Sequence, residues 1–320
     1  MERIVKFDTS LVTENNGDAI IMSYCDEILH RLFPDAFFVS LPTHEHIFIP
    51  SYKFIKKSDY QFVCGTNLLT SQMNQYAQWK IGLHDSVFLK SAVLMGVGWW
   101  EYQKKPNLYT RTLLKRVLNN DVCHSVRDSY TEKMLRSIGI DNVINTGCPT
   151  MWKLTPEFCK AIPKRKASAV VATVTNYRPN IIRDKQIFDI LLQTYATVYV
   201  WIQAFEDIAY LKDLGIWGKI KVVSPQLSEY DKLLSEKEVD YCGTRLHAGV
   251  RALNYGKRSL IVAVDNRAIE IHNDTNLPIV REEKIKETLE EKINSEWRTE
   301  INLPQKNIEF WMQQFKGENI

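Results

Sequence analysis

The chain lacks the short motifs that usually mark metal, nucleotide or disulfide chemistry. It has no C-x-x-C pair, no H-E-x-x-H, no G-x-x-x-x-G-K-[ST] loop and no G-x-G-x-x-G after its first predicted strand. Its six cysteines stand singly, mostly in apolar segments, where a reduced thiol behaves as a small hydrophobic side chain. These absences argue against a disulfide framework and a metal site, and they fit a reducing cytoplasm.

Long hydrophobic runs and a strong excess of one charge are also absent. The longest apolar run, SAVLMGVGWW, is too short to span a bilayer, and the N-terminus MERIVKFDTS lacks the pattern of a signal peptide. The 41 basic and 38 acidic residues nearly balance, without a basic stripe interleaved with aromatics, so nucleic acid is not an expected partner. We expect a cytoplasmic protein, and peripheral contact with the inner face of the cell membrane stays open.

What the chain does contain is a repeated alternation of strands and helices. Short apolar runs that end at Gly, Asn or Asp alternate with longer segments of helical period, which is typical of parallel sheets covered by helices. At 320 residues the chain also exceeds what one core usually supports. We predict an N-terminal Rossmann-like domain (1–155), a linker (156–168), a second Rossmann-like domain (169–303) and a C-terminal helix (304–320), with the two parallel sheets facing a cleft.

The predicted C-terminal helix carries Ile308, Trp311 and Phe315 on one face. We expect this face to dock on the body of the protein, and a membrane-surface role is the alternative.

Arg245 and His247 stand two residues apart between the apolar segments of VDYCGTRLHAGVRALNYG. The stretch predicts a buried strand, a turn or cap at Thr244 and then a helix, which puts Arg245 and His247 where open α/β sheets bind anions. An arginine suits a carboxylate or phosphate there, and a histidine can transfer a proton near neutral pH. An ordinary ion pair and a histidine bonded to backbone remain the alternative interpretation.

A second candidate, Arg127, follows a short predicted strand in CHSVRDSYT. Asp128 or Ser129 would cap the next helix, so this segment repeats the arrangement around Arg245. Two arginines at strand ends in opposing domains would hold one anionic ligand. The alternative is a salt bridge between Arg127 and a neighbouring acid.

Two weaker signals lie elsewhere at predicted strand ends. Asn16, Gly17 and Asp18 form either a ligand-binding loop or an ordinary turn and cap. Asp265, with Arg267 and Glu270 just beyond it, either binds a ligand or caps a helix.

The adjacent tryptophans Trp99 and Trp100 follow a predicted strand in MGVGWW. They belong either to the core or to a surface on which a sugar ring stacks.

Together these segments resemble the polysaccharide pyruvyl transferase family. DYCGTRLHAGVRALNYGKRSLIVAVDNRAIE is similar to that family's [GS]-x-R-x-H-[AG] signature between a strand and a helix, followed by a strand closing on Asp. SVRDSYTEKMLRSIGIDNVINTGCPT resembles its R-D segment and G-x-P-T turn, and NNGDAII its N-terminal loop. The resemblance implies two Rossmann-like domains arranged as in GT-B glycosyltransferases.

The resemblance also implies an activity, namely transfer of the pyruvyl group of phosphoenolpyruvate to two hydroxyls of a sugar, with release of phosphate and no metal or redox cofactor. The acceptor would be a sugar, oligosaccharide or lipid-linked sugar of a surface polysaccharide such as an exopolysaccharide or capsule. Arg245 and Arg127 would bind the donor anion, and His247 would act as general acid and base. The expected substrate-binding residues are Asn16, Gly17, Asp18, Gly65, Thr244, Asp265, Arg267 and Glu270.

Two other functions stay open from the sequence. A glycosyltransferase of the same shape would use Arg245 on the diphosphate of a nucleotide sugar and Asp265 or Glu270 on its ribose. A non-catalytic relative would bind a sugar or polyanion only. VCGTNLL and MGVGWW stand where many relatives carry a glycine triplet and a Pro-Gln pair, so the acceptor sugar is not assigned.

Overall fold

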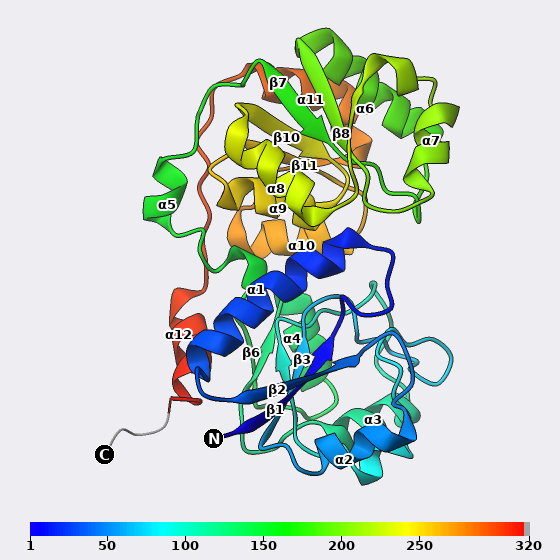
Figure 1. Cartoon of the computed structure of the whole chain (residues 1–320), viewed down its shortest axis with the longest axis vertical. Helices are drawn as coiled ribbons and strands as arrows, with labels where there is room; N and C mark the ends of the chain where they lie inside the picture. Colours follow the sequence, from blue (N-terminus) through cyan, green and yellow to red (C-terminus); the bar gives the residue numbers. More distant parts are fainter. Residues whose placement is uncertain (317–320) are drawn as a thin grey trace. The chain divides into compact units, whose positions relative to one another are not determined.

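The computed structural model describes residues 1–316, which form two compact α/β units (Figure 1). Unit 1 contains Met1–Thr13, Ile21–Trp152 and the segment from Leu303 onward, and unit 2 contains Glu14–Ile20 and Lys153–Asn302. This division differs from the predicted one in three places. The short N-terminal segment 14–20 belongs with unit 2, and the C-terminal segment belongs with unit 1. The second unit begins at Lys153, so the predicted linker 156–168 lies within it.

Unit 1 is built on parallel strands whose order reverses beside β1. Its strands are β1 (Arg3–Asp8), β2 (Phe37–Pro42), β3 (Tyr60–Cys64), β4 (Ala92–Met95), β5 (His124–Val126) and β6 (Val143–Asn145). Its helices are α1 (Asn16–Leu32), whose first turn lies in the unit 2 segment, α2 (Tyr52–Ile55), α3 (Leu108–Val117), α4 (Ser129–Arg136) and α12 (Gln305–Gln313). The order β2-β1-β3-β4 is extended to β5 and β6 by a parallel bridge between Val97 and Val126. Ligands bind such sheets at the carboxyl ends of the strands.

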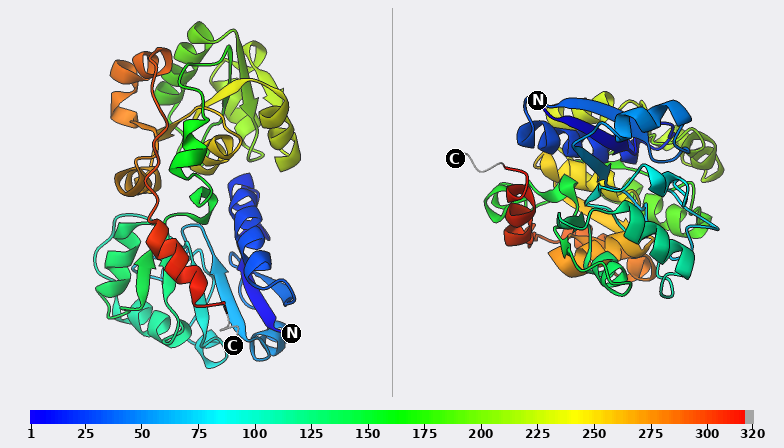
Figure 2. Two further views of the ribbon diagram at one scale, coloured as in Figure 1. Left: turned by 90° about the vertical axis from the view of Figure 1, so that its left-hand side faces the viewer. Right: turned by 90° about the horizontal axis from the view of Figure 1, so that it is seen from below.

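The C-terminal helix packs on unit 1, as Figure 2 shows for the red α12 beside the strands. Ile308, Trp311 and Phe315 are buried against residues of α1 and of the sheet. The side chain of Gln314 also exchanges two hydrogen bonds with the backbone of Cys123, at 2.8 and 2.9 Å. The expected packing role of this apolar face is therefore confirmed.

Unit 2 is a six-stranded parallel sheet with helices packed on it. Its strands are β7 (Ala169–Ala172), β8 (Thr197–Trp201), β9 (Lys221–Val223), β10 (Val239–Gly243), β11 (Ser259–Ala263) and β12 (Ile279–Arg281). Its helices are α5 (Pro156–Lys160), α6 (Ile181–Thr194), α7 (Asp207–Asp213), α8 (Leu227–Glu236), α9 (Leu246–Asn254), α10 (Asn266–Thr275) and α11 (Ile285–Asn294). The strand order is β12-β11-β10-β7-β8-β9, which reverses between β7 and β10. This is the order of a dinucleotide-binding Rossmann fold.

The stretch predicted as a linker begins with a short helix, α5. Thr155 caps it by accepting a hydrogen bond from the Phe158 N–H at 3.3 Å, and Pro156 occupies its first turn. These capping residues favour a helix although the five-residue segment is too short to show a period.

The buried His124 in β5 gives the fold a predicted sensitivity to acid. Its Nδ1 accepts a hydrogen bond from the Leu94 N–H at 3.3 Å, and its Nε2 lies 3.0 Å from the Asn119 carbonyl, so the neutral ring satisfies both partners. Burial lowers the pKa of His124 from 6.5 to about 4. Between those values the unfolded chain binds a proton that the folded protein does not, so stability is complete above pH 6.5 and declines as the pH falls towards 4.

We expect the free energy of unfolding to fall by about 3 kcal/mol over this range because of His124 alone. Urea unfolding at a series of pH values measures this loss. His124→Asn keeps an acceptor near Leu94 but cannot titrate, so its stability should change less over the same range. Equal pH dependence in both proteins would show that His124 is not responsible.

The six cysteines are all free thiols, five of them buried. Within residues 1–316, no helix is long and apolar enough to cross a membrane.

Candidate functional site

The R-x-H segment lies where the strand order of unit 2 reverses. β10 pairs in parallel with β7, with Tyr241 beside Val171, so the loops after the two strands are neighbours (Figure 1). Two glycines permit this close packing. A Cβ on Gly243 would lie 2.7 Å from the Thr173 N, and a Cβ on Gly249 would lie 2.5 Å from the Ile261 side chain. The short side chains in the motif therefore bring α9 close to the sheet.

Arg245 is 5% exposed and is held from several loops of unit 2. Its Nε donates to the Val174 carbonyl at 2.7 Å and its Nη2 to Asn176 Oδ1 at 2.9 Å. Nη1 donates to Asn15 Oδ1 at 3.3 Å, and Nη2 lies 3.5 Å from Asp207 Oδ1. These contacts fix the plane of the guanidinium and employ four of its five N–H groups, so Arg245 offers an anion a positioned positive charge and one N–H of Nη1.

Asp207, the acidic partner of Arg245, is fully buried at the start of α7. Its Oδ2 accepts hydrogen bonds from the Gln203 and Ala204 N–H groups at 2.9 and 3.0 Å. Burial raises the pKa of the Asp207 carboxyl, while Arg245 and the two N–H groups act in the opposite direction. Arg245 therefore forms the ion pair that the alternative interpretation expected, with Asp207 as its partner.

His247 is the second residue of α9 and is 7% exposed. It lies two residues after Arg245, which precedes the helix as its N-cap. The first turn of a helix carries unpaired N–H groups and a partial positive charge, which favour an anion beside the imidazole.

The predicted N-terminal loop belongs to the same unit. Asn15, which the sequence analysis did not select, donates through Nδ2 to Asp18 at 3.2 Å and accepts from Arg245. Asn16 donates to the Pro225 carbonyl at 2.6 Å, and the Gly17 N–H donates to Asn15 Oδ1 at 3.1 Å. The loop therefore lies beside Arg245, and its turn is stabilised by its own side chains.

Thr244 connects the loops after β10 and β7. Its hydroxyl lies 2.8 Å from the hydroxyl of Thr175, and its N–H donates to the Thr173 carbonyl at 3.3 Å. The Thr244 hydroxyl and N–H, through which this residue would contact a substrate, are thus already hydrogen-bonded within unit 2.

Asp265 caps α10, as one interpretation of the sequence held. It accepts a hydrogen bond from the Arg267 N–H at 3.0 Å and pairs with the Arg267 guanidinium. Arg267 also donates to the Tyr177 hydroxyl, and the Tyr177 ring lies 5.0 Å from Arg245 Cζ and 5.7 Å from Arg267 Cζ. The half-buried Glu270 lies one turn further along α10. Tyr177 thus links the two arginines.

In unit 1, Arg127 is a buried guanidinium at the carboxyl end of β5. It is 1% exposed, and its Nε donates to Asp128 at 3.1 Å. Both Nη1 and Nη2 are buried without a hydrogen-bond partner among residues 1–316. A Cβ on Gly98 would lie only 2.2 Å from Arg127 Cζ, so the missing side chain there makes room for the guanidinium. Two buried, charged donors without a protein partner are suited to an anion.

The surroundings of Arg127 are structurally well defined. Of the two predicted candidates, Asp128 and not Ser129 caps α4, by accepting a hydrogen bond from the Thr131 N–H at 2.7 Å. Gly65 follows β3 with a φ of +59°, and a Cβ there would lie 2.2 Å from the Ile21 side chain. Gly65 is therefore required by the packing of α1, at the point where the strand order of unit 1 reverses.

The two adjacent tryptophans have different environments. Trp99 is fully buried, and its indole N–H donates to Gln103 at 2.9 Å, so it belongs to the core. Trp100 is partly exposed and lies against Tyr76, with ring centroids 4.3 Å apart. Trp100 and Tyr76 together present an aromatic surface, and Trp100 lies two residues after Gly98 in the chain.

Some residues at the unit 2 site were missed by sequence reasoning. Asn176 and Tyr177 follow β7 and were detectable by the same strand-end rule that selected Arg245. Gln203, after β8, is 1% exposed, and neither atom of its amide has a partner within the described chain. Asn15 and Asp207 carry no pattern of their own, because only the fold brings them to Arg245.

The fold is shared with solved structures at low sequence identity. S. aureus MnaA, solved with UDP, matches with a TM-score of 0.56 and 12% identity, over 92% of this chain and 91% of the other. The UDP-GlcNAc 2-epimerase of Methanocaldococcus jannaschii, in complex with UDP-GlcNAc and UDP, matches with a TM-score of 0.57 and 11% identity, over 98% and 99%. This likeness shows the fold, which is GT-B-like.

A comparison with curated proteins finds no match. The model of one protein family, polysaccharide pyruvyl transferase, matches residues 15–266. That range begins at the loop beside Arg245 and includes β10, α9 and the Arg127 segment. With this match over most of its length, the chain belongs to the polysaccharide pyruvyl transferase family.

Proposed function

We propose that the protein transfers the pyruvyl group of phosphoenolpyruvate onto two hydroxyls of a sugar in a surface polysaccharide or its precursor, in the cytoplasm. The observation that carries this proposal is the family match, together with Arg245 and His247 at the strand-order reversal of unit 2. That position is where Rossmann-like sheets bind ligands. The donor is a dianionic ester with a carboxylate, and buried arginines suit both groups.

In this proposal the arginines bind the anionic groups of the donor. Arg127 offers both terminal nitrogens of a buried guanidinium, whereas Arg245 is already held by Val174, Asn15, Asn176 and Asp207. We assign to Arg127 the stronger paired contact, and to Arg245 a fixed positive charge beside His247. Their binding of the same donor molecule stays a prediction.

His247 acts in this proposal as the general acid. It protonates the methylene carbon of the donor, which becomes a methyl group and leaves an oxocarbenium-like carbon. The first sugar hydroxyl attacks that carbon, and the second displaces phosphate to close the ketal. The two sugar hydroxyls lose one proton each. One of these protons returns to His247 and replaces the proton that it gave to the methylene carbon, and the other leaves with phosphate. The histidine is thus returned to its starting state.

The Trp100–Tyr76 pair is our candidate for the acceptor side. Aromatic faces bind the apolar face of a sugar ring, and Trp100 lies two residues after Gly98, which is next to the Arg127 guanidinium. Loss of such a ring contact is worth about 1 kcal/mol, or about a fivefold change in binding. We expect Trp100→Ala to raise the KM for the acceptor by about that factor at nearly constant kcat. Tyr76→Phe keeps the ring and should leave the KM unchanged, and equal KM values in all three proteins would remove the pair from the acceptor site.

The test of the function is phosphate release from phosphoenolpyruvate. Purified protein is incubated with the donor and a panel of free, nucleotide-activated and lipid-linked sugars, and the product is examined by NMR for the ketal methyl group. Release is expected only with a suitable sugar. Absence of release across the whole panel, with a correctly folded protein, would reject the proposal.

A second candidate is a glycosyltransferase that uses a nucleotide sugar. It is favoured by the two structural neighbours, which were solved with UDP or with UDP-GlcNAc and UDP. Arg245 would then contact the diphosphate, and Asp265 or Glu270 the ribose. Thermal stabilisation by uridine or guanosine diphosphates, without stabilisation by phosphoenolpyruvate, would favour this function.

A further inference from the structure

Unit 1 exposes a group of large apolar side chains on neighbouring segments. Phe48 and Ile49, in the short turn before α2, are 72% and 78% exposed, and Phe54 in α2 is 40% exposed. Phe37, at the start of β2, is 62% exposed. Single exposed apolar residues are ordinary, but two adjacent ones on an ordered turn with others nearby suggest an interaction surface.

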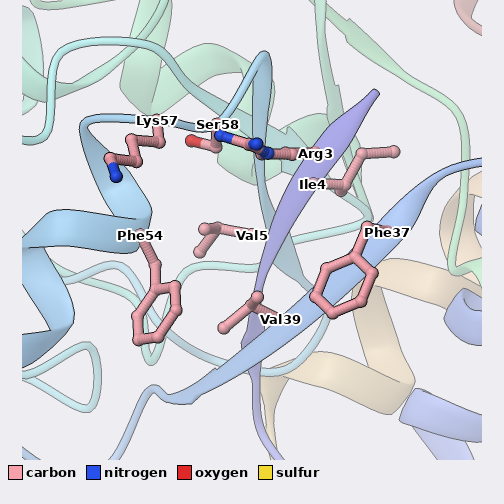
Figure 3. A pocket seen from close by; sticks show the side chains of 8 residues that line it. All are labelled: Arg3, Ile4, Val5, Phe37, Val39, Phe54, Lys57 and Ser58. Carbon is pink, nitrogen blue, oxygen red and sulfur yellow. The ribbon is translucent and has the colours of Figure 1, made fainter. Parts of the chain in front are cut away.

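A groove lies beside Phe37 and Phe54, as Figure 3 shows. It has a volume of about 240 Å³ and lies between the first halves of β1 and β2 and helix α2. The rings of Phe37 and Phe54 stand on either side of Val5 and Val39, while Lys57 lies along the rim (Figure 3). The groove lies at the amino ends of the strands, whereas Arg127 lies at the carboxyl end of β5. A ligand bound in the groove would therefore leave the carboxyl ends of the strands accessible.

Within residues 48–57 every charged side chain is a lysine. Lys53, Lys56 and Lys57 are exposed on and just after α2, and Arg3 lines the groove. The Lys53 and Lys56 ammonium groups lie 4.8 and 4.4 Å from the ring centroids of Phe54 and Phe88. The exposed acids lie on the neighbouring segments and are Glu2, Asp35, Glu45 and Asp59. Asp59 accepts a hydrogen bond from the Arg3 N–H. Lysines that flank exposed aromatic rings match a surface with an apolar interior and anionic headgroups.

We propose that the surface formed by Phe37, residues 48–57 and the groove beside them binds the face of a bilayer that contains anionic lipids. Phe48 and Ile49 enter the boundary between headgroups and acyl chains, and the three lysines contact the headgroups. The C-terminal helix does not serve this purpose, because its apolar face is buried in unit 1. The inference is independent of the proposed function, since none of these residues is assigned to substrate binding.

The test uses the full-length protein and vesicles of phosphatidylglycerol mixed with phosphatidylcholine. We expect co-sedimentation with these vesicles, weaker binding to pure phosphatidylcholine, and release by added salt. The variant Phe48→Ser/Ile49→Ser should bind at least about tenfold more weakly, because two apolar side chains are removed. The variant Lys53→Gln/Lys56→Gln/Lys57→Gln should lose on the order of 100-fold, and only towards anionic vesicles.

A matched control is the pair Ile181→Ser/Ile182→Ser. These residues are also adjacent and exposed, at 54% and 75%, but lie at the start of α6 in unit 2. The control should sediment like the parent protein. Phosphate release with a soluble acceptor should be unchanged in all the variants, so that loss of binding and failure of the proposed activity are separate results.

Three outcomes would overturn the proposal. The parent protein could fail to sediment with the anionic vesicles, or the Phe48/Ile49 variant could sediment as well as the parent. A protein that does not bind vesicles but forms a dimer abolished by Phe48→Ser/Ile49→Ser would assign the surface to a second copy of the chain instead.

Discussion

Replacement of His247 by alanine is expected to lower kcat for phosphate release by about 10²- to 10⁴-fold, which is the usual contribution of a general acid. The imidazole lies in the first turn of α9, beside the arginine that we assign to the donor site. Without it, no other assigned group delivers a proton to the methylene carbon. The measurement is steady-state phosphate release, with the affinity for phosphoenolpyruvate determined separately by calorimetry.

The control for this prediction is the folding of the variant. His247 is 7% exposed, so its truncation could also disturb packing. A catalytic role predicts that the melting temperature and the donor affinity stay close to those of the parent protein while turnover is lost. If activity falls only in proportion to the folded fraction, or if donor binding is lost together with turnover, His247 is not the general acid.

Arg127→Met is expected to weaken binding of phosphoenolpyruvate by on the order of 10²-fold, because a pair of charged hydrogen bonds worth about 3 kcal/mol is removed. The argument rests on the two buried terminal nitrogens that have no partner within residues 1–316. Isothermal calorimetry with phosphoenolpyruvate measures the loss. Because Asp128 loses its ion-pair partner in this variant, the melting temperature must be compared as well.

Gly98→Ala provides a second variant that keeps the charge. Its added methyl group would lie 2.2 Å from Arg127 Cζ, so the guanidinium must move. We expect a loss of donor affinity in the same direction as for Arg127→Met. Gly218→Ala is the matched control, since a Cβ there meets nothing within 4 Å. Donor binding by Gly98→Ala at the strength of the parent protein would mean that the Arg127 guanidinium does not hold the donor.

The amino-acid sequence was sufficient for the alternation of strands and helices. Most strands of unit 2 are mainly apolar runs bounded by turn residues, and its longer helices show the helical period of apolar residues. The same local signals placed Arg245 at the N-cap of α9 and His247 in its first turn, and they made Asp128 and Asp265 candidate helix caps. Helix caps and strand-to-helix turns depend on residues within a few positions of one another, so they can be predicted from the sequence alone.

The tertiary structure decided which distant residues share a site. Asn15 and Asp207 lie 230 and 38 positions from Arg245, and no local pattern predicts their hydrogen bonds to it. The reversal of strand order between β7 and β10 is also a property of the pairing of strands, which depends on packing and not on the period of any one strand.

The same distinction explains Arg127 and the surface around Phe48. The sequence identified Arg127 as a candidate, but only the packed fold leaves its terminal nitrogens buried and unpaired beside Gly98. In the same way FIPSYKFIKK could be read as core or as surface, because its apolar residues fit either. Exposure is decided by the elements that cover a side chain, and in unit 1 they leave Phe48 and Ile49 uncovered.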